Sequence, residues 1–255
     1  LRALWVALAA TPSVLLLAVT NQISQEVAVV PFLWILPLAI YLLSFVFTFE
    51  SDRWYRREVF LPALVLTSAL AGGAMWQGLG LGAVAQVAIW CAFLFVASML
   101  CHGELARLRP HPRHLTGFYL MVSAGGAVGG LFVGVLAPLV FDLHWELHVG
   151  ILAVWLLAAI MLLRDRGPRL ERRGFRLART GFAACFFVLL GLLAAEARLA
   201  VEPWKLVRRN FYGVLRVGEG FADDPERSGL GLRHGRVTHG FQHHRETKRR
   251  EPTIY

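Results

Sequence analysis

The sequence has 255 residues, of which 56% are hydrophobic and 17% are charged, and its mean hydropathy is +0.55. This balance is more apolar and less charged than that of soluble globular domains, which argues against an ordinary soluble protein. Long apolar runs recur along most of the chain and predict bilayer spans rather than one buried core. Because the chain opens with Leu1 and ends at Tyr255 in a polar stretch, we expect it to be a fragment.

Charge is divided unevenly along the chain. Residues 1–163 hold seven arginines and seven acidic residues, whereas residues 164–255 hold nineteen lysines or arginines and ten acidic residues. Basic loops beside apolar spans commonly set membrane orientation. We therefore expect a lipid bilayer as partner and no nucleic acid. The three cysteines lie in apolar runs and indicate neither a disulfide framework nor a thiolate metal site.

Seven apolar runs are long enough to be candidate spans, since a span needs about 20 mostly apolar residues to cross about 30 Å of hydrocarbon. Helices are required because an isolated strand would leave its backbone unpaired in lipid. The candidate spans are residues 4–20, 27–49, 59–77, 80–101, 115–141, 147–163 and 180–197. The sequence thus predicts an all-α polytopic membrane bundle over residues 1–200.

The loops between the spans alternate in charge. Those reading "TNQISQE", "QGLGLG" and "DLHWELH" contain no lysine or arginine, whereas "ESDRWYRRE", "GELARLRPHPRH" and the loop after Leu163 are rich in arginine. The positive-inside rule places the arginine-rich loops in the cytoplasm. After seven crossings the tail from Pro203 would lie outside, unless the last apolar run lies along the interface.

Glycines in the fifth span form a helical stripe. The stretch "SAGGAVGGLFVG" repeats glycine at four-residue spacing, which lets another helix approach closely in lipid. We expect a helix-packing seam, and we expect replacement of Gly126 and Gly130 by leucine to disrupt folding. A substrate path along the stripe is the alternative. The spacing suits packing within one chain and between the copies of a homo-oligomer. The packing residues are Gly125, Gly126, Gly129, Gly130 and Gly134.

Ionisable residues near the span ends are the next candidates, because buried charge in a membrane is costly and usually functional. For His102 and Glu104 we expect solvation at the interface, with gating or proton relay as the alternative. The group Asp142, His144, Glu146 and His148 is expected to be a solvated loop, because its alternating spacing fits no standard zinc pattern.

Residues 201–255 predict a β-rich module. "NFYGVLRV" alternates as a half-buried strand does, and "LGLRHGRVTHGFQ" indicates a second strand region with glycine turns. A small antiparallel sheet follows from these two segments. The histidines here are interpreted as hydrogen-bonding or site-rim residues, since a zinc site would need a helix that Gly240 disfavours.

Several blocks together resemble a known family. "WVALAATPSVLLLAVTNQIS", "VAVVPFLWILPLAIYLLSFVFTF", "CHGELARLRPHPRHLTGFYLMVSAGGAVGG" and "FYGVLRV" with "LRHGRVTHGFQ" are similar to bacterial fused major-facilitator-like/spermidine synthase-like membrane proteins. The resemblance implies a multi-pass protein of the bacterial inner membrane. It also implies that residues 201–255 begin a polyamine aminopropyltransferase-like domain, whose full-length form binds decarboxylated S-adenosylmethionine or S-adenosylmethionine.

The resemblance also implies substrate-binding positions. "LRHGRVTHGFQ" resembles a hairpin that reads as leucine, an Asp-Gly pair and a following glutamine near the nucleotide substrate of spermidine synthases. His234 stands where that aspartate would be, and Thr238 or Gln242 takes the place of the glutamine. The family's glycine-rich loop and catalytic aspartates are absent, so no catalytic residue is predicted. The implied binding residues are His234, Gly235, Thr238, His239, Gln242 and Tyr255.

Two functions remain open at this point. In the first, the chain is the membrane-embedded portion of a spermidine synthase-like transferase, which anchors the enzyme or moves its polyamine substrate or product. In the second, it is a transporter-like or structural membrane protein whose β module binds a ligand without catalysis. The fragment itself is expected to hold no cofactor and no metal, and to be inactive as an enzyme.

Overall fold

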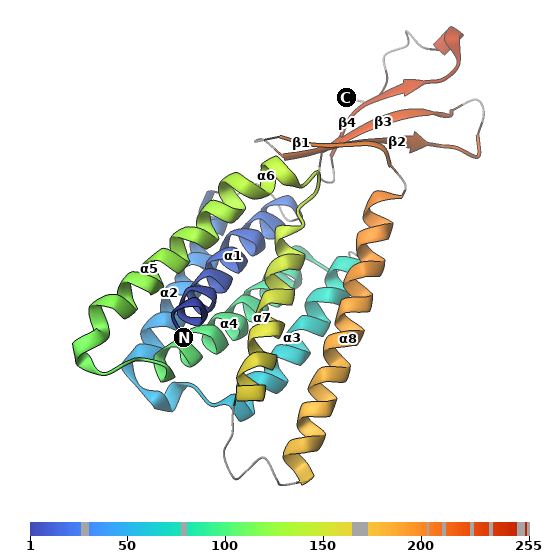
Figure 1. Ribbon diagram of the computed structural model, residues 1–255. Helices are drawn as coiled ribbons and strands as arrows, with labels where there is room; N and C mark the ends of the chain where they lie inside the picture. Colours follow the sequence, from blue (N-terminus) through green and yellow to red (C-terminus); the bar gives the residue numbers. More distant parts are fainter. Residues whose placement is uncertain are drawn as a thin grey trace.

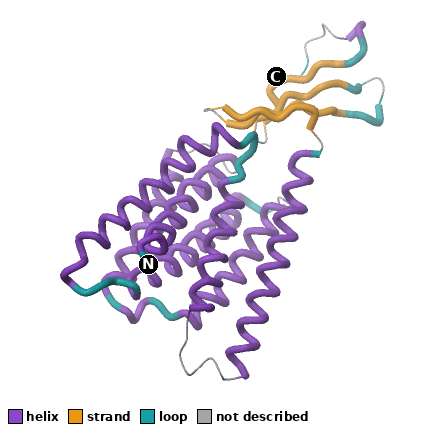
Figure 2. The backbone as a smooth tube through the Cα atoms, in the orientation of Figure 1, coloured by secondary structure: helices purple, strands orange, loops and turns teal. Residues whose placement is uncertain are grey.

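The computed structural model describes residues 1–26, 31–77, 81–164, 173–202, 204–210, 213–224, 227–234, 237–248 and 253. In these residues a helical bundle precedes an antiparallel sheet (Figures 1 and 2). The helices are α1 (Arg2–Glu26), α2 (Ile35–Glu50), α3 (Arg57–Gln77), α4 (Ala83–Arg107), α5 (Leu115–Leu131), α6 (Ala137–Val140), α7 (Glu146–Arg164) and α8 (Arg173–Val201). The strands are β1 (Trp204–Asn210), β2 (Gly213–Gly220), β3 (Gly229–His234) and β4 (Val237–His243).

Six helical stretches in the described residues are long and apolar enough to cross a membrane. They are Arg2–Gln25, Arg57–Met75, Ala83–Arg107, Pro112–Val140, Glu146–Arg164 and Arg179–Val201. The predicted span 27–49 differs, because α2 has 16 residues and follows a separate 3₁₀ turn that begins at Pro31. Residues 27–30 of that span lie outside the described residues. The helical bundle is therefore as predicted, with one helix shorter than expected.

The centre of the bundle is formed by α1 and α4. Helix α1 packs against α4, α5 and α7, and α4 also packs against α2 and α3. Helix α8 lies at the edge against α3 and α7, where the Phe182 ring stacks on the Trp155 ring at 4.7 Å between centroids. Its outer surface exposes large apolar side chains, including Phe187 and Val188. Apolar surface of this extent is unusual on a soluble monomer.

Two glycines of the predicted seam lie against α1. A Cβ atom added to Gly125 would lie 2.5 Å from the Val6 carbonyl oxygen, and one added to Gly129 would lie 2.5 Å from that of Ala10. No described atom lies within 4 Å of the corresponding positions at Gly126, Gly130 and Gly134. The seam is therefore narrower than the sequence predicts, because the i, i+4 pair at 125 and 129 is the pair that faces α1.

The four strands form a meander in the order β1-β2-β3-β4. The predicted strand at 210–217 is divided between two strands, because Asn210 ends β1 and pairs with Gly213 at the start of β2. Phe211 and Tyr212 lie outside the described residues. The β3–β4 hairpin pairs His234 with Val237, as the "LRHGRVTHGFQ" segment suggested. The small antiparallel sheet is thus confirmed, and β1 is a strand that the sequence reading omitted.

The sheet lies across one end of the bundle (Figure 1). Its strand β1 begins at Trp204, directly after α8 ends at Val201, and it contacts the connection between α6 and α7. Helix α8 runs alongside the bundle and not across its end. The sheet therefore shares an end of the bundle with the "DLHWELH" connection, which has no lysine or arginine.

Candidate functional site at the junction of sheet and helices

A buried ion pair joins the sheet to the bundle. Arg209 of β1 donates from Nη1 to Glu146 Oε2 and from Nη2 to Glu146 Oε1, each at 2.8 Å. Its Nη1 also donates to the carbonyl oxygen of Leu143 at 2.8 Å. The side chains of Arg209 and Glu146 are 5% and 0% exposed. Because a planar guanidinium matches a carboxylate in this two-bond geometry, the pair fixes both position and angle.

The position of Glu146 in the sequence explains why a carboxylate is stable at this point of the chain. The residue lies in the first turn of α7, where a carboxylate interacts favourably with the helix dipole. Arg209 is on the same face of β1 as Val207, and its Cα partner across the ladder is the buried Val214. The face of the sheet that carries Val214 therefore packs toward the helices. This ion pair was not predicted from the sequence. An acidic residue at the start of an apolar helix was the feature that could have indicated it.

The four ionisable residues of the α6–α7 region have four different partners. Asp142 Oδ1 lies 3.8 Å from Arg208 Nη1, and His144 Nε2 lies 3.0 Å from Gln25 Nε2. The remaining two, Glu146 and His148, bind Arg209 and Glu196, the latter at 2.6 Å between His148 Nε2 and Glu196 Oε2. Among the described residues no group of three histidines, cysteines or acids is placed to hold a metal ion.

Burial decides the charge state of His144. Desolvation, followed by the positive charge of Arg209, lowers its pKa from 6.5 to about 4. A neutral imidazole accepts the hydrogen bond that the Gln25 amide donates, so the side chain links the end of α1 to the connection before α7. The expectation of a solvated loop is therefore wrong for Glu146, which is fully buried, and holds for the exposed Asp142.

The predicted binding residues are only partly gathered together. His234 ends β3, and its ring lies 5.8 Å from that of His239 in β4. Pairing places Gln242 on the same face as His234, and Thr238, opposite Arg233, on the other face. The His234 ring also lies beside Gly213, whose φ of +141° favours glycine. Gly235 and Tyr255 lie outside the described residues.

The opposite end of the bundle holds a second buried carboxylate. Glu104 of α4 accepts a hydrogen bond from the Tyr55 hydroxyl at 2.7 Å and forms two contacts with the Arg57 guanidinium. Burial, and then the negative charge of Glu104, raise the pKa of Tyr55. Glu104 and its neighbour His102 are each 1% exposed, so the expectation that they are solvated is wrong. His102 Nδ1 lies 2.9 Å from Ser44 Oγ.

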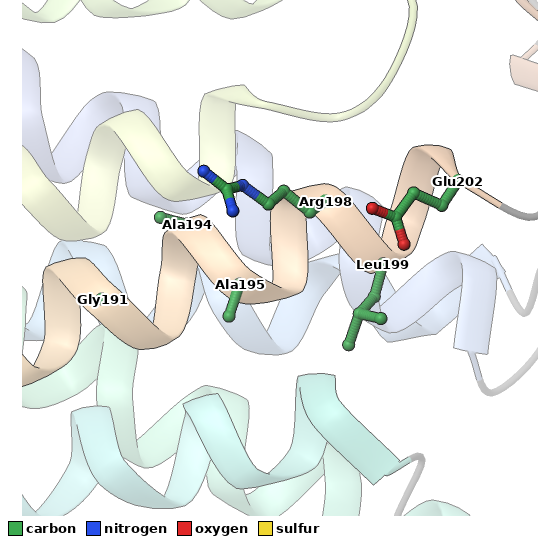
Figure 3. A pocket seen from close by; sticks show the side chains of 6 residues that line it. All are labelled: Gly191, Ala194, Ala195, Arg198, Leu199 and Glu202. Carbon is green, nitrogen blue, oxygen red and sulfur yellow. The ribbon is translucent and has the colours of Figure 1, made fainter.

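A cavity of about 530 Å³ lies along the last turns of α8 (Figure 3). Its surface is mainly apolar, and its charged residues are Arg198 and Glu202. The lining residues are Gly191, Ala194, Ala195, Arg198, Leu199 and Glu202. Of the predicted binding residues that the structure describes, none lines this cavity.

Comparisons of this chain with the models of known protein families, with curated protein sequences and with solved structures found no match. The geometry of the junction and of the sheet therefore carries the functional argument.

Proposed function

We propose that this chain is the membrane-embedded portion of a spermidine synthase-like protein, and that its helices anchor the β module at one surface of the bilayer. The Arg209–Glu146 pair is the observation that carries this proposal. It ties the first strand to the start of α7 through two hydrogen bonds of 2.8 Å in a buried setting. A sheet held this way keeps one orientation relative to the helices.

The apolar outer surface supports insertion into a bilayer. Six described helices have the length and composition of spans, and α8 turns Phe187 and Val188 outward. Charged groups gather at the two ends, in the Glu104 and Glu146 clusters, and ionisable residues at such positions pair with one another in membrane proteins. We place the chain in the bacterial inner membrane, where it crosses several times.

The face of the sheet that points away from the helices supports ligand binding. His234 and His239 lie next to each other, and His234 leaves the sheet on the side opposite Val214. Their imidazoles, with Gln242 on the same face, supply donors and acceptors for an amine or for the nucleoside part of a sulfonium donor. Decarboxylated S-adenosylmethionine or S-adenosylmethionine is the proposed donor, and a polyamine is the proposed acceptor.

A second function is favoured by where the sheet lies. It shares an end with the connection that lacks lysine and arginine, which the positive-inside rule assigns to the outside. Polyamine synthesis uses cytoplasmic metabolites, so an external sheet fits a transporter-like or structural protein with a non-catalytic ligand-binding module. The side of the membrane that the sheet occupies therefore distinguishes the two functions.

Thiol labelling measures that side directly. The native cysteines Cys91, Cys101 and Cys185 are first replaced by alanine, and then Asp223→Cys, in the turn after β2, and Arg53→Cys, at the other end of the bundle, are introduced singly. A membrane-impermeant maleimide is applied to intact cells and to inverted vesicles. Labelling of the Asp223→Cys variant in inverted vesicles alone supports the synthase-like function, and labelling in intact cells alone supports the second. Labelling of both variants from one side contradicts a membrane-spanning bundle.

Ligand binding is tested separately, with the full chain in lipid nanodiscs and a radiolabelled sulfonium donor. We expect binding by the wild-type protein, and a loss of about tenfold in the His234→Ala variant because one hydrogen-bonding group is removed. The Arg227→Gln variant, in the turn after β2, serves as the control and should bind normally. Binding of the sulfonium donor that is unchanged by His234→Ala would contradict a ligand site at His234.

A further inference from the structure

Two arginines are direct partners across neighbouring strands. Arg216 of β2 and Arg233 of β3 are Cα partners in the ladder, so their side chains leave the sheet on the same face. It is also the face of Val214, which packs toward the helices. Like charges directly opposite each other destabilise a sheet unless something compensates them. The repulsion between Arg216 and Arg233 must therefore be offset by another group.

The same aromatic ring lies under both guanidinium groups. The Cζ atoms of Arg216 and Arg233 are each 5.7 Å from the centroid of the Trp204 ring. A tryptophan face attracts cations through its quadrupole but carries no net charge. Trp204 therefore positions the two arginines side by side but supplies no negative charge.

No described carboxylate contacts either arginine. In the part of the chain that the structure describes, neither Arg216 nor Arg233 has an acidic side chain within 4.0 Å. Glu196 of α8 is the carboxylate whose charge reaches Arg216, and its Oε2 already lies 2.6 Å from His148 Nε2. Two guanidinium groups held together in this way present several N–H donors to one anion.

The position of the pair narrows the choice of anion. Figure 1 shows α8 leading into β1, which begins at Trp204, and the outer surface of α8 is apolar. Because both guanidinium groups lie over the Trp204 ring, the arginine pair lies near this junction. Tryptophan is enriched at the membrane–water interface, and arginine forks match the oxygens of phosphate. We propose that Arg216, Arg233 and Trp204 form a binding site for a phosphate group. Its source is an anionic lipid headgroup or a free phosphate.

The lipid source rests on the proposed membrane anchoring, whereas the phosphate site itself does not. The full chain is purified in a neutral detergent, and binding is measured by native mass spectrometry at constant ionic strength. Three probes are titrated: dioctanoyl phosphatidylglycerol, inorganic phosphate and dioctanoylglycerol, which has no phosphate. The wild type is compared with the Arg216→Gln/Arg233→Gln variant. The Arg208→Gln/Arg227→Gln variant is the matched control, because it removes two exposed positive charges elsewhere on the sheet and its turn.

We expect the site variant to bind phosphatidylglycerol at least about tenfold more weakly than the wild type, since two charge-assisted contacts are lost. The control should match the wild type. Binding of phosphatidylglycerol without binding of inorganic phosphate identifies the lipid headgroup as the source, and binding of both identifies a site for phosphate in general. Equal affinities in the three proteins, or equally tight binding of dioctanoylglycerol, would overturn the proposal. If the double variant does not fold, Arg233→Gln alone, at an exposed position, should show a smaller loss.

Discussion

Arg209 and Glu146 lie 63 positions apart in the sequence and meet through two hydrogen bonds of 2.8 Å, with side chains 5% and 0% exposed. This contact joins the sheet to the helices more firmly than the polar contacts around it. The neighbouring Arg208–Asp142 pair, by contrast, is 3.8 Å long with both side chains largely exposed. Exposed pairs contribute little, whereas one buried partner left alone is costly.

Replacing Arg209 with leucine should therefore detach the sheet. The substitution leaves the Glu146 carboxylate buried without its cation, and we expect a loss of about 3–5 kcal/mol in the free energy of unfolding. Arg208→Leu, one residue away and exposed, should change it by less than about 1 kcal/mol. Denaturant unfolding of the purified protein measures both. Equal losses in the two variants would show that the buried pair does not hold the sheet.

The reactivity of a buried position gives a second test of the same contact. Val214 is 4% exposed beneath the sheet, so Val214→Cys in the cysteine-free background should react slowly with a water-soluble maleimide. Adding Arg209→Leu should make it react faster, because the sheet separates from the helices. The doubly substituted Arg209→Leu/Glu146→Leu protein should recover much of the protection, since no charge then remains buried. Slow labelling in all three proteins would contradict a role in docking.

The effect of replacing a glycine of α5 with alanine should depend on whether that glycine faces α1. A Cβ atom at Gly125 or Gly129 would meet backbone oxygens of α1 at 2.5 Å, so Gly125→Ala and Gly129→Ala should each destabilise by about 1–3 kcal/mol. Gly126→Ala and Gly130→Ala enter open space and should be neutral or slightly stabilising, because alanine favours helix. Thermal unfolding and size-exclusion profiles of the four variants check this. Destabilisation by Gly126→Ala as large as by Gly125→Ala would contradict the structure.

The sequence predicted what depends on local pattern. Apolar runs of span length gave the helices, and alternation with glycine turns gave the antiparallel sheet. The glycine spacing indicated a packing seam, but it did not indicate which of two offset glycine rows faces the partner. That choice depends on where α1 lies, and α1 is more than a hundred residues away in the sequence.

The sites were less predictable because they depend on distant partners. Glu104 and His102 sit at the end of a span and were expected to be solvated, yet Arg57 and Ser44 from other helices bury them. Glu146 was grouped with its sequence neighbours, whereas its partner comes from the first strand. A charge pair between segments far apart leaves no spacing signal, since either residue alone matches an ordinary interfacial charge.

Removal of the Glu104 charge should weaken the other end of the bundle. Glu104→Gln leaves the Arg57 guanidinium without its carboxylate and the Tyr55 hydroxyl with a weaker acceptor, so we expect a loss of about 3 kcal/mol or more. Glu50→Gln is the matched control, because Glu50 is exposed and accepts one hydrogen bond from Trp54 Nε1. Unfolding of both variants in denaturant provides the measurement. A Glu104→Gln protein as stable as the control would rule out a structural role for this cluster.

Stability should fall on mild acidification because of His144. Burial and then the Arg209 charge lower the pKa of this imidazole from 6.5 to about 4, so the folded protein holds it neutral while the unfolded chain takes up a proton near pH 6.5. The free energy of unfolding should therefore decrease as the pH falls from about 6.5 to about 4. His144→Gln cannot take up that proton, and its amide is able to meet Gln25, the partner of the imidazole. Unfolding temperatures of both proteins across this pH range should diverge, with the variant showing the shallower decline. Parallel curves would mean that the protonation of His144 is not linked to folding.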